Sequence, residues 1–514
     1  MRLPEAEKGF QAFNTRGSNE RRGVGAALPI GSLAALLLLA GCKPVGPNYS
    51  RPTYTAPPAY KETGASTVQT PLAPPPNPQG GGWQPANPSD GMLKGKWWEI
   101  YQDPQLNQLE ERIATYNQGL RQALQTYLAA QDQTKAARSA LFPKLSAGPS
   151  FEHEKLSEHR PLTGVTTPSS YNDLQLEGQG SWEPDFWGRI RRTVEAAHVN
   201  AQASAADMAN VNLSLQAAMA TNYFQLRGAD AQIKLLNQTI KDLEDQLDLA
   251  KRRLQGGVAT EADVAQAQTQ LETTRAQLVD VGVARAQYEH AVGTIADYKL
   301  PSFTIPFSPL DLPLPTIPIG VPSQLLERRP DIAAAERRTA AANEQIGIAV
   351  SAFYPTISLT GQGGFESTHG GTWIQGPSAL WSLGAQATEL LFDAGQRRAL
   401  TDEAIHQYEA QVSGYKGVIF LAFEDVEDQL SGLRILEQES GAEQKAVASA
   451  QHSYDISNQR YKGGVTSYLE VLTAEATLIQ NQQTAVQLQT RQFVDSVALV
   501  RSLGGGWDTT QLPK

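Results

Sequence analysis

The chain contains an internal duplication, and this feature constrains its fold more than any other. Residues 248 to 271 and 455 to 478 share a pattern of identical residues at a constant shift of 207 positions, as from 253 to 460. The identical pairs are Arg253 and Arg460, Gly256 and Gly463, Gly257 and Gly464, Val258 and Val465, Val264 and Val471, Ala267 and Ala474, and Leu271 and Leu478. The repeat indicates two tandem halves of about two hundred residues each.

Each half contains long stretches without proline, in which helices can continue. No proline occurs from 105 to 142, from 185 to 300 or from 379 to 512. From Ile233 to Leu254 apolar residues recur at spacings of three and four, which is the seam of a coiled coil. A helix from about 189 to 254 is about 100 Å long at 1.5 Å per residue. This helical pattern alone does not exclude a rod-like two-stranded coiled coil.

Two alternating stretches interrupt the helical pattern of each half. We expect strands at about 144 to 156, 171 to 184, 356 to 367 and 379 to 391, where apolar and polar residues alternate. Alternation over about ten residues, with aromatic residues near the ends, is typical of membrane β-strands. A pair of soluble hairpins with aromatic core residues is the alternative.

Four strands in one chain are too few to close a membrane barrel, because the smallest single-chain barrels have about eight. An open sheet edge is not tolerated in lipid. We therefore expect other copies to supply the remaining strands, and a ring of three chains provides about twelve in a symmetric arrangement. The expected fold class is an α+β membrane protein with long helices continuing from a shared barrel.

The N-terminal region predicts export and lipidation. The apolar run from 24 to 41 is a secretion signal, so we expect 1 to 41 to be a signal peptide. Leu39-Ala40-Gly41-Cys42 resembles a bacterial lipoprotein processing box, which makes Cys42 the expected lipidation site. Cys42 is the only cysteine, so no disulfide within the chain is possible. The formal net charge of −10 disfavours a nucleic-acid partner.

The remaining divisions follow composition and the repeat. We expect a lipidated strap rich in proline and glycine at 42 to 96, a first repeat at 97 to 300 and a proline-rich connector at 301 to 330. A second repeat is expected at 331 to 507 and a tail at 508 to 514. The acidic cluster Glu424, Asp425, Glu427 and Asp428 is interpreted mostly as solvated surface.

Several specific runs occur along the mature chain. They include WWEIYQDPQLNQL at 97 to 109, LLERRPDIAAAE at 325 to 336, LLFDAGQRR at 390 to 398 and LGGGW at 503 to 507. In these runs the chain resembles the TolC-like outer-membrane efflux factors, in the lipoprotein branch typified by OprM and NodT. The resemblance implies a homotrimer with a twelve-stranded outer-membrane barrel, a helical tunnel across the periplasm and an equatorial belt. It also implies a periplasmic adaptor and an inner-membrane pump of the RND class as partners.

The repeated Gly-Gly pairs read as sharp reversals between antiparallel helices, because glycine accepts a positive φ. Purely structural turns are one interpretation. The resemblance places these turns at the periplasmic tip and so implies adaptor contact there. The implied contact residues are Arg253, Gly256, Gly257, Val258, Arg460, Gly463, Gly464 and Val465.

The resemblance also implies an aperture just beyond the second turn. Tyr461 matches the tyrosine of the closing network, and Glu470 and Thr473 match the two acids of the constriction ring. Thr473 departs from that pattern because it carries no carboxylate. Asp263 is grouped with the aperture as well. Carboxylates facing one axis repel each other and attract cations, although a solvated helix face also explains Glu470.

We expect a passive duct rather than an enzyme, without a cofactor or metal apart from the lipid on Cys42. A type I protein secretion duct and a structural lipoprotein that braces the outer membrane are the alternatives. Bilayer conductance separates a duct from a brace. The sequence of the duct does not identify the transported substrate.

Overall fold

The computed structural model describes residues 43–63, 95–157, 170–320 and 322–513. The expected signal peptide, Cys42 and the strap from 64 to 94 lie outside these described residues. The chain divides into one unit at 1 to 43 and another at 44 to 514.

The duplication of the sequence is also a duplication of helix lengths. Helices α4 and α8 have 67 residues each, α5 and α9 have 35 each, and α3 and α7 have 22 each. Their bounds are Gln118–Ser139 for α3, Arg189–Gln255 for α4, Glu261–Ile295 for α5, Pro330–Ser351 for α7, Gln396–Lys462 for α8 and Tyr468–Ser502 for α9. Two shorter helices are α2, Pro104–Tyr116, and α6, Leu325–Arg328. The two halves therefore have matching long helices.

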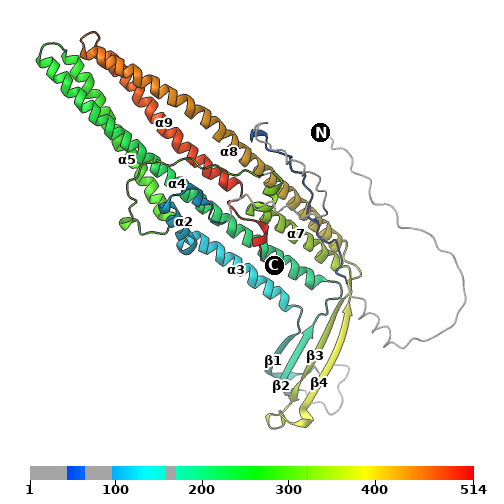
Figure 1. Cartoon of the computed structure of the whole chain (residues 1–514). Helices are drawn as coiled ribbons and strands as arrows, with labels where there is room; N and C mark the ends of the chain where they lie inside the picture. The colour runs from blue at the N-terminus through cyan, green and yellow to red at the C-terminus, as the bar shows by residue number, and fades with distance from the viewer. Residues whose placement is uncertain (1–42, 64–94, 158–169, 321, 514) are drawn as a thin grey trace, which may run out of the picture. The chain divides into compact units, whose positions relative to one another are not determined.

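The long helices form two antiparallel hairpins that lie side by side. Helix α4 packs along α5 and α8 along α9, and α4 also contacts α9 (Figure 1). The predicted seam is buried at Leu236, Leu243, Leu247 and Ala250, while Leu254 at its end is exposed. In the described part of the chain, none of the helices is long and apolar enough to cross a membrane.

The four strands form one antiparallel sheet in the order β1-β2-β3-β4. Their bounds are Lys144–Lys155, Ser170–Trp182, Thr356–Ser367 and Ala379–Thr388. The strand predicted to reach 391 ends at Thr388, because Thr388 pairs with Thr356, the first residue of β3. The pairing of β2 with β3 joins the two halves of the chain. Among the described residues, β1 and β4 each pair along one edge only, so the sheet has two open edges.

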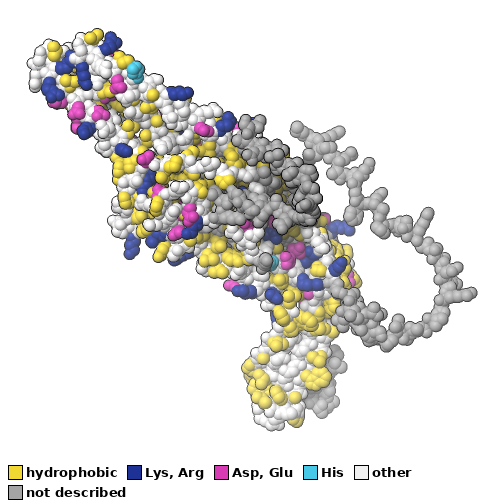
Figure 2. Space-filling model, in the orientation of Figure 1, with side chains coloured by type: hydrophobic (Ala, Val, Ile, Leu, Met, Phe, Trp, Pro, Cys, Tyr) yellow, Lys and Arg dark blue, Asp and Glu magenta, His cyan; other side chains and the backbone are white. Residues whose placement is uncertain are grey.

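The two faces of the sheet differ in chemistry. The face that holds Leu145 and Leu383 is apolar, and both side chains are about four-fifths exposed, at 84% and 80%. The opposite face carries amides, hydroxyls and the carboxyl groups of Glu152, Asp173 and Glu177. The visible side of the sheet in Figure 2 carries hydrophobic side chains, whereas basic and acidic side chains are spread over the helices. A sheet with one exposed apolar face and one polar face fits the wall of a membrane barrel.

The main core lies where the N-terminal aromatic residues meet the long helices. Trp97, Trp98 and Tyr101, in the short 3₁₀ helix Trp97–Tyr101, are buried against α4 and α9. Tyr101 packs against Phe224 and Phe493, with ring centroids 4.7 and 6.1 Å away. Residues of this cluster therefore tie the start of the first repeat to both hairpins.

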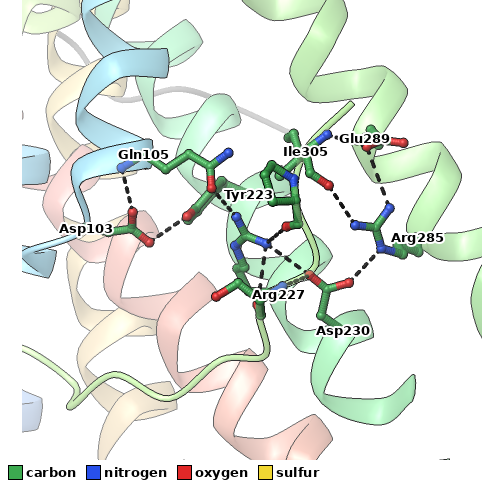
Figure 3. A network of polar contacts seen from close by, with 10 residues as sticks. Asp103, Gln105, Tyr223, Arg227, Asp230, Arg285, Glu289 and Ile305 are labelled. Carbon is green, nitrogen blue, oxygen red and sulfur yellow. Dashed lines mark hydrogen bonds and ion pairs between the residues drawn. The ribbon is translucent and has the colours of Figure 1, made fainter. Parts of the chain in front are cut away.

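A buried ionic network fixes the connector to the first repeat (Figure 3). Asp230, which has no exposed surface, forms ion pairs with Arg227 at 3.0 Å and Arg285 at 2.6 Å. Arg227 donates to the carbonyl oxygen of Pro306, and the backbone N–H of Ser308 donates to Asp230. The figure also labels Asp103, Gln105, Tyr223, Glu289 and Ile305. The connector is thereby tied to α4 and α5 rather than left as a loose link.

The strap begins beside the sheet. Pro44 lies against Gly188, the residue before α4, and a Cβ added at Gly188 comes within 2.4 Å of the Pro44 ring. Gly188 also has a φ of +85°, which favours glycine. Arg192 donates to the carbonyl oxygens of Val45 at 2.6 Å and Gly46 at 3.1 Å. The start of the strap is held where β2 is followed by α4.

The described part of the strap reaches the acidic cluster of α8. The carboxylate of Glu427 accepts hydrogen bonds from the backbone N–H groups of Lys61 at 2.7 Å and Glu62 at 3.0 Å. Asp425 in the same cluster forms an ion pair with Arg329 at 3.0 Å. The interpretation of this cluster as mostly solvated surface agrees with Asp425, whose side chain is 55% exposed, whereas Glu427 is only partly exposed. Both carboxylates hold segments from other parts of the chain.

Candidate functional site at the hairpin ends

The two Gly-Gly pairs end α4 and α8 in the same type of turn. At the first turn, the N–H of Val258 donates to the carbonyl of Arg253 and the N–H of Gly257 to that of Leu254, both at 2.9 Å. This pair of bonds is the Schellman arrangement, which satisfies carbonyls left free at a helix end. The second turn repeats both bonds at 2.9 and 3.0 Å. Both turns are thus held by hydrogen bonds between residues that are close together in the sequence.

Only the second glycine of each pair needs its left-handed backbone. Gly257 and Gly464 both have a φ of +74°, whereas Gly256 and Gly463 have a φ of −78°. The positive φ expected of glycine at these turns is therefore found at the second glycine of each pair. A Cβ on Gly256 meets its nearest atoms at 3.6 Å, an ordinary contact. Packing inside the chain does not explain glycine at that position.

The ends of the two hairpins are packed against each other. The guanidinium of Arg253 lies 4.3 Å from the ring centroid of Tyr461 and donates to the Tyr461 carbonyl at 2.7 Å. Tyr461 contacts the ring of Tyr468 at 5.4 Å, and burial raises the pKa of Tyr461. Beneath them, Leu243, Leu247, Ala267, Leu271 and Val471 complete an apolar cluster. Arg253 and Tyr461 are thus a direct contact between hairpins.

Two of the four predicted aperture residues share a groove. Glu470 and Thr473 line a groove of about 450 Å³ between α8 and α9, together with the hydroxyls of Ser453, Ser457 and Thr477. Glu470 lies 3.8 Å from Arg460 in an ion pair whose side chains are both half-exposed. Ala450, Leu469 and Ala474 also line the groove, so its surface is of mixed polarity and carries one carboxylate.

Asp263 lies elsewhere and has a local structural role. Its carboxylate accepts the backbone N–H of Thr260 at 2.8 Å, while the Thr260 hydroxyl accepts the N–H of Asp263 at 3.2 Å. This capping box stabilises the start of α5. The structure does not bring Asp263 into the groove of Glu470 and Thr473.

Sequence reasoning missed Glu475, a buried carboxyl group on α9. It lies between Val471 and Leu478 at spacings of four and three, so it occupies a seam position of the helix. Its exposed fraction is 4%. That spacing is the signal that predicts its burial. No group of three metal-ligating side chains occurs within the described residues.

Comparison with known proteins identifies the class. The family model described as "Outer membrane efflux protein" matches residues 110–296 and 321–505. The toluene efflux pump outer membrane protein TtgF of Pseudomonas putida is 32% identical over 93% of this chain and 96% of its own length. The probable efflux pump outer membrane protein TtgC of the same species is 31% identical over 84% of this chain and 89% of its own length. The solved structure of the outer-membrane channel OprN matches with a TM-score of 0.80 and 29% identity, over 90% of this chain and 99% of that chain.

The fold is that of a subunit of a trimeric outer-membrane channel, with four strands and long helices in each chain. The chain belongs to the outer membrane efflux protein family. The expected fold class, the outer-membrane location with extension into the periplasm, and the function as the outer-membrane channel of an efflux system are confirmed. The efflux duct is therefore favoured over the secretion duct and the brace.

Proposed function

We propose that three copies of this chain form the passive exit duct of a tripartite efflux system, fed by a periplasmic adaptor and an inner-membrane RND pump. One observation carries the proposal: an amphipathic four-stranded sheet with two open edges is joined to helices of 67 residues. Such helices are about 100 Å long, which suits a tunnel that continues below the membrane.

The alternation of strand directions suits closure by identical copies. The order β1-β2-β3-β4 is antiparallel throughout, so β4 runs opposite to β1. The β4 edge of one copy and the β1 edge of the next can then pair antiparallel all around a ring. This pairing satisfies the backbone groups that an open edge leaves unpaired in lipid.

The hairpin ends are the proposed contact with the adaptor. Val258 and Val465 are about 70% exposed at the turns, with values of 69% and 71%. Gly256 and Gly463 have no steric reason within the chain to be glycine. A partner backbone that approaches closely is a reason for glycine there. The basic pair Arg253 and Arg460 completes the proposed contact set with Gly257 and Gly464.

Glu470, Thr473 and Tyr461 are the proposed aperture. Three symmetry-related copies of the Glu470 carboxylate on one axis favour cations over anions. Thr473 adds a hydroxyl instead of a second carboxylate, so the constriction carries one acidic ring at this level. Asp263 caps α5, and its charge also acts on Tyr461, so it stays part of this proposed set.

Cys42 is the proposed lipid attachment site. Pro44, two residues further along the sequence, lies against Gly188 beside the sheet. A strap that starts next to the membrane strands suits a lipid anchor at its first residue. The covalent lipid is the only non-protein group that we propose, and we propose no enzyme activity for the duct.

Reconstitution tests the channel. We expect the purified full-length protein to conduct ions in planar bilayers, with a cation preference that falls in Glu470→Ala. A protein that is trimeric but never conducts contradicts the duct.

A second experiment tests the adaptor contact. We expect the double variant Gly256→Ala and Gly463→Ala to lose cross-linking to the adaptor in cells while it unfolds at the wild-type temperature. The matched control is Gly282→Ala on α5, where an added Cβ has nothing within 4 Å. Equal cross-linking in all three proteins contradicts the proposed contact.

A further inference from the structure

The seam of α9 contains a carboxyl group in a place where apolar side chains are expected. Glu475 lies near the apolar cluster that joins the hairpin ends, between Val471 and Leu478. Its Oε1 accepts a hydrogen bond from Gln246 of α4 at 2.6 Å. Its Oε2 is buried without a hydrogen-bond partner among the described residues. A buried carboxylate that is only half satisfied is costly, unless it carries a proton.

Gln246 connects three helices at this point. Its amide nitrogen donates to Glu475 of α9 and, at 3.0 Å, to the hydroxyl of Tyr454 on α8. Its amide oxygen accepts the hydroxyl of Tyr468 on α9 at 3.3 Å. The carboxyl of Glu475 therefore contributes to a polar junction between the first hairpin and the second.

The charged groups around this junction do not compensate a negative charge on Glu475. The negative charge of Asp242 on α4 raises the pKa of Glu475 directly. The charge of Asp455 on α8 raises the pKa of Tyr454, and the charge of Asp263 on α5 raises the pKa of Tyr468. All three are acids. The nearby cation Arg253 is directed at Tyr461 instead. The one charged side chain that acts on Glu475 itself, Asp242, thus opposes its ionisation, and no cation offsets it among the groups that act on Glu475, Tyr454 and Tyr468 in the described residues.

We propose that Glu475 is a proton-dependent latch between the hairpins. With its proton, it holds α9 against α4, and ionisation weakens that contact and favours separation of the hairpin ends. The consequence for gating rests on the proposed channel function, whereas the effect on packing does not. The latch adds a gating residue that acts at a distance from the proposed constriction at Glu470.

The direction of the pH effect follows from the environment. Burial raises the pKa of Glu475 to about 7, and the hydrogen bond from Gln246 opposes this rise in part. Because the packed state binds the proton more tightly than an opened state with an ordinary carboxyl, low pH favours the packed state. With an opened-state pKa of about 4.3, the opening equilibrium increases about tenfold between pH 6 and pH 8.

Hydrogen exchange of the full-length trimer tests the latch directly. We expect protection of residues 468 to 480, relative to the matching segment 261 to 273 of the first hairpin, to fall about tenfold from pH 6 to pH 8. The reference segment corrects for the intrinsic pH dependence of exchange. Glu475→Gln keeps the shape without the charge, so its relative protection should not change with pH.

Two further variants keep the test decisive. Glu470→Gln removes a half-exposed carboxyl from the same helix and should retain the wild-type profile. Gln246→Leu removes the donor to Glu475 and should move the midpoint to higher pH, which tests the latch even if Glu475→Gln does not fold. A flat wild-type profile, or an unchanged profile in Glu475→Gln, overturns the proposal.

Bilayer recordings separate the latch from the channel. We expect wild-type opening to become more frequent as pH rises from 6 to 8, and Glu475→Gln to stay at the low frequency. If no protein conducts at any pH, the duct proposal fails while the exchange experiment still decides the latch. Conduction with the same pH dependence in wild type and Glu475→Gln refutes the gating role.

Discussion

Position 227 of α4 and position 434 of α8 are the same position of the repeat, and both hold arginine. Arg227 is buried with Asp230 and binds the connector at the carbonyl oxygen of Pro306. Arg434 is about half exposed and forms an ion pair with Glu62 of the strap at 2.5 Å. Each half thus uses this arginine to hold a segment from another part of the chain. The difference in burial determines how much each one contributes.

Other paired positions show the same contrast. Gly188 and Gly395 both precede a 67-residue helix with left-handed φ values of +85° and +91°. Pro44 covers Gly188, whereas nothing lies within 4 Å of a Cβ placed on Gly395. The duplication has therefore kept helix lengths and backbone turns, while the segments packed on the helices differ between the halves.

The largest expected effect is at the paired arginines. Arg227→Ala should lower stability by about 3 to 5 kcal/mol, because it leaves Asp230 buried with one cation fewer. Arg434→Ala should change little, because its ion pair is exposed to solvent. Thermal unfolding of the detergent-purified proteins, with proteolysis of the connector, measures both. Equal losses in the two variants contradict the role of burial.

The paired glycines give the next largest difference. Gly395→Ala should cost about 1 kcal/mol for its left-handed backbone. Gly188→Ala should have the same backbone cost and lose a further 1 to 3 kcal/mol of stability, roughly, because the new methyl group displaces Pro44. The unfolding temperature of each variant measures its total loss of stability. Proteolysis of the strap shows whether the strap has been released from the helix. A strap that stays protected in Gly188→Ala refutes the proposed contact.

At the hairpin ends, Arg253 and Arg460 are the comparable pair. Arg253→Ala should lower the stability of the contact by about 1 to 2 kcal/mol, because it removes a cation–π contact and a hydrogen bond. Arg460→Ala removes only a long, exposed ion pair and should have little effect. Exchange of the backbone amide hydrogens of residues 455 to 470 measures the effect of both variants. Greater exchange in Arg460→Ala than in Arg253→Ala reverses the expected order.

The smallest difference is expected within one turn. Gly257→Ala should cost about 1 kcal/mol, because a side chain disfavours its positive φ. Gly256→Ala should leave stability unchanged, because its backbone is right-handed and an added Cβ makes only ordinary contacts at 3.6 Å or more. Chemical denaturation resolves the two variants. A loss in Gly256→Ala similar to that in Gly257→Ala shows that the first glycine has a structural role after all.

Much of the architecture follows from local sequence. Proline placement and seam spacing predict α4 within one residue at its end, and alternation predicts β3 at Thr356–Ser367. The tertiary contacts of charged residues were not predictable in this way. Glu427 was expected to be solvated, yet it binds the strap from a distance of more than 360 positions. Composition does not reveal which distant segment covers a helix.

The candidate site was predicted only in part. The turns were located by the repeat, but the sequence did not distinguish Gly256 from Gly257, because φ depends on position within the turn. Asp263 was assigned to the aperture, and the cap that its carboxylate forms for α5 was not predicted. Glu475 was overlooked although its spacing from Val471 and Leu478 places it on the seam. The aperture roles of Glu470, Thr473, Tyr461 and Asp263 stay predictions.

Cross-linking between sheet edges tests the central claim most directly, namely that each copy closes its open edges with its neighbours. Single cysteines placed along β1 and along β4, in a Cys42→Ser background, can form disulfides only between paired strands. We predict covalent trimers when one β1 and one β4 cysteine are combined, and none when both lie on β1. Oxidised protein that runs only as a monomer for every combination contradicts the account.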